Sequence, residues 1–519
     1  MAQSQMKVIP EGSYLINMGL SPQTHSNALK PYGLLYDLLN NYQVEVEWVI
    51  RPGKKKDETD FAHDDTAYRS GSFVIPVSYI SDEVAQRIRE WEKKGVAGSY
   101  SKSSMNLPVF TSLSVAPKWT LDKENGSIAL PFFQAAEIPS SAYGGSSSEG
   151  WKDPSELGVC DDIFVMPHAD PKFETHKNLY FWNRDYKGAI WAGCRAVSTL
   201  ENIKGRDADE NKGSGKLIQL NFLSAGFAGA PSAGLVPYYD HRNATPPYTH
   251  LFPHDPVAQY LGSTDKAHLN GSERVYFPKA INLWREETKR LVIDPDAPDI
   301  PSKSKGEAAM IVYGHAFGNP RNGMVMYEGG HSIYGSGPEY IAAMRAFFNW
   351  SFYTTEIKRK ENLIKFQAYG KDKTIVAARV GDDLTRVLNL DPIHFDLDKA
   401  QIRENDKEGL EAIVQFMKEH PALLLDIRSH TDSRAADAYN LELSRERVKA
   451  TIAYFTAQGI DAERLSGRGY GETELLNDCS NGKPCSERKH ELNRRSEFIL
   501  SIDCRLYAEL GENARLSAE

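Results

Sequence analysis

Short apolar runs separated by amphipathic segments fill most of the first 375 residues. Within residues 29–42, leucines recur at positions 34, 35, 38 and 39, the spacing of one face of a helix. Ser81 can cap a second helix, which Gly95 can end. Apolar runs predict strands at 14–19, 44–50, 73–76, 109–113, 162–167, 309–314 and 323–328. Strands that alternate with helices favour a mostly parallel α/β sheet, and residues 226–253 predict a long loop excursion.

Near the C-terminus, a predicted strand and the helix that follows it carry two opposite charges, those of Asp432 and Arg447. The apolar run 423–427 predicts a strand, and a polar stretch that contains Asp432 follows it. The next segment places Leu441, Val448, Ile452 and Phe455 on one helical face, with Arg447 beside that stripe. A carboxylate and a guanidinium held on rigid elements suit a ligand that carries its own ammonium and carboxylate groups.

Several ordered motifs over residues 391–503 resemble one family, the OmpA-like peptidoglycan-binding domain. Residues 392–399 look like its first strand, and residues 467–472 look like its glycine loop. The central signature comprises His430-Thr431-Asp432, Asn440, Leu443-Ser444 and Arg447, and the closing strand is 493–498. Ser429 and Glu446 depart from the residues common in this family. The resemblance implies a C-terminal α/β domain with a mixed sheet.

The resemblance also implies a ligand and the residues that bind it. Asp432 would bind the ammonium and Arg447 the carboxylate of diaminopimelate in a peptidoglycan stem peptide. Asn440 and Asp398 match positions that line the same pocket. The late motifs look most like the OmpA-like domains of Bacteroidota. This resemblance implies a periplasmic protein associated with the outer membrane. It also implies an outer-membrane or surface-assembly protein as a partner.

Composition and charge narrow the function class. The chain has 519 residues, enough for two to four domains. Its net charge of -9, without a prominent basic patch, argues against nucleic-acid binding. No apolar stretch is long enough to cross a bilayer, and no export signal is visible. Because a peptidoglycan-binding protein must leave the cytoplasm, we expect that an export signal was removed or replaced.

The five cysteines suggest one short disulfide. Cys479 and Cys485 flank a turn-rich loop and would form a disulfide in an oxidising compartment. The alternative is a pair of reduced loop thiols. Their spacing does not match paired zinc knuckles, and the sequence predicts neither a metal nor a cofactor.

One turn in the N-terminal region hints at catalysis. Residues 187–198 predict a strand that runs through a small-residue turn at Cys194 into a helix, a position that exposes a nucleophile. This element and residues 327–331 resemble the class I glutamine amidotransferase-like fold, including ThuA-like proteins. The resemblance implies a flavodoxin-like sheet and a Cys194–His331 pair with Glu328 nearby. The family's glycine–cysteine–glycine signature is missing.

Other interpretations of these residues stay open. Cys194 can be a small buried hydrophobe, or it can pair with Cys160. His168, Asp170 and His176 could be metal ligands, but their spacing favours an ordinary loop with satisfied polar residues.

We divide the chain into an α/β domain, residues 1–375, and an OmpA-like domain, residues 376–519. Two hypotheses about its function result. In the favoured one, the protein is a non-enzymatic anchor that tethers a partner of its N-terminal domain to peptidoglycan. In the alternative, it is a Cys-dependent hydrolase or amidotransferase-like enzyme attached to the wall.

Overall fold

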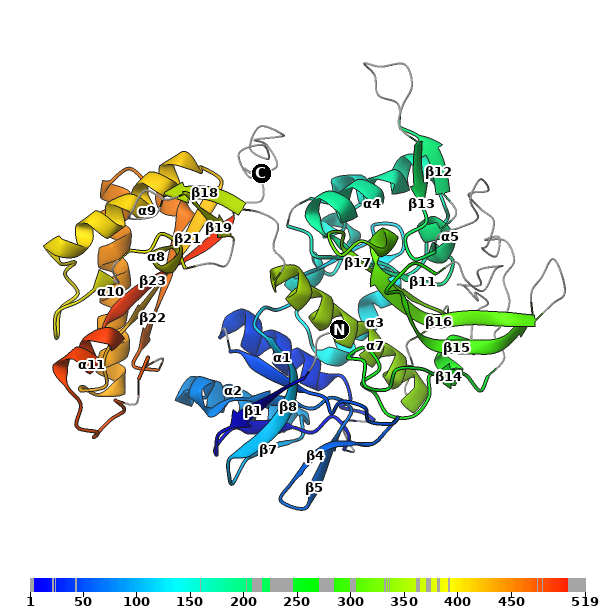
Figure 1. Cartoon of the computed structure of the whole chain (residues 1–519), viewed down its shortest axis with the longest axis horizontal. Coiled ribbons are helices and arrows are strands. Elements are labelled where there is room, and N and C mark those ends of the chain that lie inside the picture. The colour runs from blue at the N-terminus through cyan, green and yellow to red at the C-terminus, as the bar shows by residue number, and fades with distance from the viewer. Residues whose placement is uncertain are drawn as a thin grey trace. The chain divides into compact units, whose positions relative to one another are not determined.

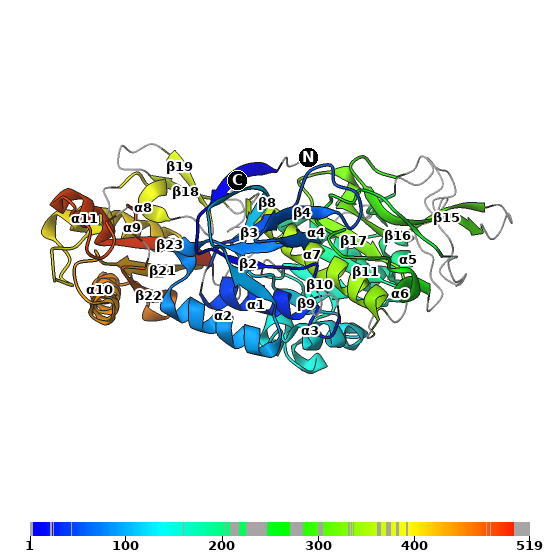
Figure 2. The same cartoon turned by 90° about the horizontal axis from the view of Figure 1, so that it is seen from below.

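The chain divides into two compact units, Met1–Lys358 and Arg359–Glu519. The computed structural model describes residues 4–20, 23, 25–42, 44–158, 160–201, 203–207, 217–224, 246–269, 284–298, 305–330, 333, 335, 337–360, 365–369, 375–379, 383–390, 393–473, 475–477 and 479–502 (Figures 1 and 2). The predicted boundary at 375/376 falls inside strand β19 (Ile375–Arg379), which pairs with β18 (Lys365–Tyr369). None of the described helices is both long and apolar enough to span a membrane.

The first sheet of the N-terminal unit is antiparallel throughout its described pairs. Its strands, in spatial order, are β1 (Gln5–Ile9), β8 (Met105–Leu113), β3 (Val46–Val49), β6 (Phe73–Ile75), β2 (Tyr14–Ile16) and β7 (Gly98–Tyr100). The prediction of a mostly parallel sheet is therefore wrong here.

The reason lies in how the two helical crossovers are interleaved. Helix α1 (Lys30–Asn41) connects β2 to β3, and both strands are antiparallel to β6, which lies between them. Helix α2 (Asp82–Lys94) likewise connects β6 to β7 across β2. Each strand–helix–strand unit does join parallel strands, but these strands are not neighbours. Alternating strands and helices predict the crossover and cannot reveal the strand that is inserted between its ends.

The second sheet is mixed, and its parallel part holds the turn at Cys194. The described order is β14 (Thr249–His250), β15 (Lys289–Pro298), β16 (Lys305–His315), β17 (Met324–Glu328), β11 (Ala189–Gly193), β10 (Ile163–Met166) and β9 (Trp119–Leu121). The neighbours from β17 to β9 are parallel, and those from β14 to β17 are antiparallel. The flavodoxin-like fold is not confirmed.

Helices cover both faces of the second sheet. Helix α7 (Pro338–Lys360) and α3 (Leu130–Ala136) pack with α1 in an aromatic core that also receives the first sheet. Helices α4 (Phe173–Tyr186) and α5 (Ala196–Glu201) pack on the opposite face of this sheet (Figure 1). The other face of the first sheet is covered by the hairpin β4 (Thr59–His63)–β5 (Thr66–Arg69). Further elements are β12 (Ile203–Arg206) and β13 (Leu217–Leu220), which contribute to the core on the side of α4 and α5, and α6 (Asp265–Leu269).

The C-terminal unit is built on a mixed sheet, as predicted. Its order is β20 (Ile393–His394), β23 (Arg495–Ile502), β21 (Leu423–His430) and β22 (Leu465–Gly471). Among the described pairs of this sheet, only β21–β22 is parallel. Its helices are α8 (Leu384–Val387), α9 (Lys407–Glu419), α10 (Asp437–Ala457) and α11 (Glu487–Asn493). These elements run from yellow to red in Figure 1.

Helix α10 buries a more polar face than its apolar stripe predicts. Val448 and Phe455 are buried, but Leu441 and Ile452 are only half-buried, and Arg447 takes a buried place. Glycines of β22 make this packing possible. A Cβ atom at Gly469 would lie 2.5 Å from the backbone nitrogen of Arg445. The helix backbone therefore lies directly on the strand, and its polar side chains reach the end of β21.

Candidate functional site

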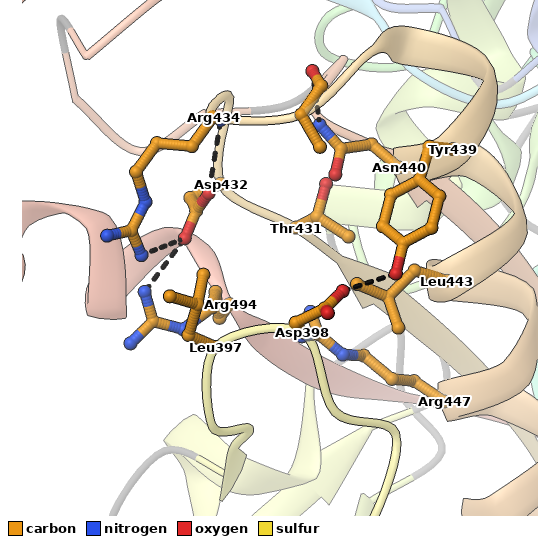
Figure 3. A pocket seen from close by; sticks show the side chains of 11 residues that line it. Leu397, Asp398, Thr431, Asp432, Arg434, Tyr439, Asn440, Leu443, Arg447 and Arg494 are labelled. Carbon is orange, nitrogen blue, oxygen red and sulfur yellow. Dashed lines mark hydrogen bonds and ion pairs between the residues drawn. The ribbon is translucent and has the colours of Figure 1, made fainter.

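A cavity of about 510 Å³ opens where β21 ends and α10 begins (Figure 3). It is lined by residues from three chain segments: Leu397 and Asp398; Thr431, Asp432, Arg434 and Ala435 with Tyr439, Asn440, Leu443 and Arg447; and Arg494. All four residues predicted to bind a ligand therefore line one cavity. Their common role in binding stays a prediction, which the geometry below supports.

Arg447 is a buried cation held by backbone carbonyl groups. Its Nε donates to the carbonyl of Lys399 at 3.0 Å, and its terminal nitrogens donate to the carbonyls of His430 at 2.6 Å and Asp396 at 3.4 Å. Its side chain is 0% exposed and stacks over the Phe395 ring at 4.7 Å. Among the described residues, no carboxylate forms an ion pair with it. Burial, followed by the charge of Arg494, lowers the pKa of Arg447 to about 10.

Asp432 belongs to a closed ring of ion pairs. Its Oδ2 accepts from Arg434 at 2.7 Å and from Arg494 at 2.8 Å. Both arginines also bind Glu487, at 2.7 and 2.8 Å, so two positive and two negative charges alternate around the ring. Burial raises the pKa of Asp432, but the hydrogen bonds from Arg434 and Arg494 outweigh burial and lower it to about 2. Asp432 therefore carries its charge at neutral pH in a fixed orientation.

Asp398 and Tyr439 lie on the opposite side of the cavity from this ring (Figure 3). The Tyr439 hydroxyl donates to the Asp398 carboxylate, which also lies close enough to Arg447 to raise its pKa. Asp398 adopts a left-handed backbone conformation with φ of 58°, which costs a residue with a Cβ atom some energy. The loop thus holds the carboxylate at the mouth of the cavity.

Asn440 shapes the loop after Asp432. Its amide donates to the carbonyl of Ala435 at 3.2 Å and to the carboxylate of Glu472 on the turn after β22. Both N–H groups of the amide are therefore used inside the protein. A contact of Asn440 with ligand would have to involve its carbonyl oxygen.

A disulfide between Cys479 and Cys485 lies next to the ion-pair ring. The Ser433 hydroxyl donates to the Cys479 carbonyl, which ties the loop that carries Asp432 and Arg434 to the disulfide segment. That segment leads into α11, where Glu487 closes the ring. The disulfide thus stabilises the side of the cavity formed by Arg434.

Sequence reasoning missed Arg434 and Arg494 as members of the site. Both lie inside motifs that were recognised, one in the stretch after the central strand and one in the closing Asn-Arg-Arg segment. Their positive charges identify these arginines as members of the site only when the fold has brought residues 432 and 494 together.

Residues 394–488 match the model of the OmpA family. The C-terminal unit carries an OmpA-like domain. Two of the motifs that overlap this range, residues 392–399 and the central signature from His430 to Arg447, contribute residues that line the cavity described above. The matched range covers the C-terminal unit only in part and does not extend into the N-terminal unit.

Related chains match this protein over about a fifth of its length. It is 31% identical over 114 residues to outer membrane porin F of Pseudomonas aeruginosa, 22% of this chain and 31% of the porin. It is 29% identical over 110 residues to the peptidoglycan-associated lipoprotein of Agrobacterium fabrum, 21% of this chain and 59% of that protein. A photosystem I P700 chlorophyll a apoprotein A2 of Gloeobacter violaceus is 36% identical over 114 residues, 21% of this chain and 13% of that protein. The chain thus spans less than two thirds of each of these relatives.

Among solved structures, the peptidoglycan-associated lipoprotein of Burkholderia pseudomallei is 22% identical with a TM-score of 0.20. The match covers 22% of this chain and 92% of that one.

Within the predicted Cys194–His331–Glu328 group of the N-terminal unit, the structure separates Glu328 from Cys194. Glu328 is fully buried and accepts from the indole of Trp191 at 3.2 Å, with His268 Nε2 at 3.4 Å. Trp191 and Glu328 face the core that contains α7, whereas Ala192 and Tyr327 face the side of α4 and α5. Glu328 therefore points away from the Cys194 side of the sheet, and His331 lies outside the described residues.

The pairing of Cys194 with Cys160 is also wrong. Cys160 is disulfide-bonded, whereas Cys194 is a buried thiol outside any disulfide. In the described part of the chain, no three His, Cys, Asp or Glu side chains are grouped closely enough to bind a metal ion. His176, one suggested ligand, bonds instead to the backbone of Lys172.

Proposed function

We propose that the C-terminal cavity binds the diaminopimelate residue of peptidoglycan and that the protein is a cell-wall anchor. The observation that carries this proposal is Arg447, a fully buried guanidinium without a carboxylate partner among the described residues. Three backbone carbonyls and the charges of Asp432 and Asp398 favour this cation, but they do not offset the whole cost of burial, which lowers its pKa. A carboxylate that enters the cavity would offset this cost.

The number of unused N–H donors on Arg447 supports a carboxylate as its ligand. A guanidinium has five N–H donors, and three of them are directed to the carbonyls of Lys399, His430 and Asp396. Two donors remain, the number that one carboxylate accepts in a bidentate contact.

The second half of the proposed ligand is an ammonium group. Asp432 and Asp398 present carboxylates on opposite sides of the cavity (Figure 3). Asp432 uses Oδ2 for both arginines, while Oδ1 accepts only from the backbone N–H of Arg434 at 3.2 Å among its described contacts. We assign the ammonium to Asp432, with Asn440 and Asp398 as further lining residues. The match to the OmpA family and the likeness to a peptidoglycan-associated lipoprotein support this assignment.

The proposed setting follows from the ligand. Peptidoglycan lies in the cell envelope, so we place the protein in the periplasm in association with the outer membrane. The resemblance of its late motifs to OmpA-like domains of Bacteroidota suggests a Bacteroidota-like cell. The N-terminal unit would hold a protein of the outer membrane or of a surface assembly close to the wall.

Sedimentation with purified sacculi tests the anchor. The full chain should co-sediment, and Arg447→Gln and Asp432→Asn should each reduce the bound fraction strongly. The matched controls are Arg445→Gln and Asp426→Asn, which change exposed or half-buried charges on the same helix and strand outside the cavity. Equal binding by all five proteins would contradict the proposal.

A further inference from the structure

Cys194 occupies a strained turn at the end of a parallel strand. It follows β11 directly, precedes α5 by one residue, and has a φ of 48°, in the left-handed region. A residue with a Cβ atom adopts that conformation only at an energetic cost. The turn lies at the carboxyl edge of the parallel strands β9, β10, β11 and β17, the edge where open α/β sheets bind ligands.

An imidazole faces the thiol across this edge. His168 Nδ1 lies 3.4 Å from Cys194 Sγ. The two strands pair in parallel with Met166 opposite Ala192, so His168 and Cys194 each come two residues after paired positions. The sheet register therefore places the nucleophile and a base at the same height.

Two further contacts fix this arrangement. Arg195, next to Cys194, forms an ion pair at 3.3 Å with Asp170, which lies two residues after His168. Asp170 is about half exposed, so the ion pair joins the two loops at the protein surface. Beneath the turn, the hydroxyl of the buried Tyr327 donates to the Cys194 carbonyl at 3.0 Å. The turn is thus held from both sides with its thiol directed to His168.

We propose that Cys194 and His168 form a nucleophile–base pair that transfers acyl groups from amides or esters. His168 takes the thiol proton at Nδ1, and Sγ attacks the carbonyl carbon of the substrate. The C–N or C–O bond breaks as the protonated His168 returns the proton to the leaving amine or alcohol. Water then hydrolyses the thioester, with His168 taking and returning its proton, so the products are a carboxylic acid and the free thiol.

This pair differs from a merely buried cysteine in its geometry. Packing alone requires neither a left-handed backbone nor an imidazole nitrogen at the sulfur atom. Glu328 does not lie beside Cys194, because its carboxylate is held on the opposite face of the sheet. Asp170, two residues after His168, forms its ion pair with Arg195.

The rate of alkylation by iodoacetamide tests the proposal in the full chain. Cys479, Cys485 and Cys160 are disulfide-bonded, so mass spectrometry of the Cys194 peptide isolates the relevant thiol among the described cysteines. We expect Cys194 to react with an apparent pKa well below about 8.5, the value of an ordinary thiol. His168→Gln should slow the reaction at pH 6.5 by about tenfold or more and return the apparent pKa toward that value.

Controls and a second reagent keep the test decisive. His176→Gln removes a buried imidazole on α4 that hydrogen-bonds only to the Lys172 backbone among its described partners, and it should leave the profile unchanged. p-Nitrophenyl acetate should leave an acetyl thioester on Cys194, and Cys194→Ser should lack it. The proposal fails if His168→Gln matches wild type in its alkylation profile, or if no acetyl thioester forms on folded protein. Neither result would bear on peptidoglycan binding, which is measured separately with sacculi.

Discussion

The proposed carboxylate-binding role of Arg447 leads to a quantitative prediction for two ligands and two proteins. The ligands are a soluble stem peptide with diaminopimelate and the same peptide with lysine, which keeps the ammonium and lacks the side-chain carboxylate. The proteins are the full chain and its Arg447→Gln variant. If Arg447 binds that carboxylate, only the pair of wild type and diaminopimelate gains the contact.

The structure sets the size of the effect. Two N–H donors of Arg447 remain after its three backbone contacts. A hydrogen bond between charged groups contributes about 1.5 kcal/mol or more, so two of them contribute about 3 kcal/mol. Wild type should therefore bind the diaminopimelate peptide about 150-fold more tightly than the lysine peptide. Arg447→Gln should bind both with nearly the same, weaker affinity.

Isothermal titration calorimetry measures the four dissociation constants, and their double difference is the coupling free energy between residue and carboxylate. Arg445→Gln, on the exposed side of α10, is the matched control and should behave as wild type. Arg447→Lys should fall between, because it keeps the charge and loses the planar fork. A coupling below about 0.5 kcal/mol, with every variant folded by circular dichroism, would refute the assignment of Arg447.

Three further predictions concern the framework of the cavity. Because the folded pKa of Asp432 is lowered from 3.8 to about 2, its ion pairs should stabilise the C-terminal unit by about 2 kcal/mol above pH 4, and this stability should be lost as the pH falls through about 2. Hydrogen exchange of β21 amides in wild type and Asp432→Asn checks this, and a difference that persists below pH 2 would contradict it. Reduction of the Cys479–Cys485 disulfide should cost roughly 2 kcal/mol and speed proteolysis of the loop, measured by cleavage kinetics with and without reductant. Gly469→Ala places a methyl group 2.4 Å from Ser444 Oγ and against the α10 backbone, so we expect a loss of about 1–3 kcal/mol in thermal unfolding and weaker sacculus binding.

Much of the C-terminal unit could be predicted because its signals are local and ordered. The apolar run before Asp432 forms β21, and the segment with Arg447 forms α10. One partner of Asp432, Arg434, lies two residues away, but the other partner could not be predicted in the same way. Arg494 follows 62 residues later, and only the antiparallel pairing of β23 with β21 brings its side chain to the cavity. Ion pairs between distant segments depend on sheet order, which hydrophobic periodicity does not encode.

In the N-terminal unit, the limits of local signals are clearer. The alternation of strands and helices predicted α1 and α2 as crossovers, but the interleaved antiparallel strands depend on long-range pairing. The turn at Cys194 was visible in the sequence as small residues between a strand and a helix. Its imidazole partner is His168, 26 positions earlier, because the parallel register of β10 and β11 selects it.

The sequence by itself thus determined the local elements, the motifs of the OmpA-like domain and the identity of the charged residues, since these depend on neighbours along the chain. The tertiary structure alone decided which charges meet. It surrounds Asp432 with two arginines, leaves Arg447 without a carboxylate among the described residues, and places His168 at Cys194. The physical reason is that ion pairs and proton transfers need contact within a few ångströms, and only strand order and register create that contact.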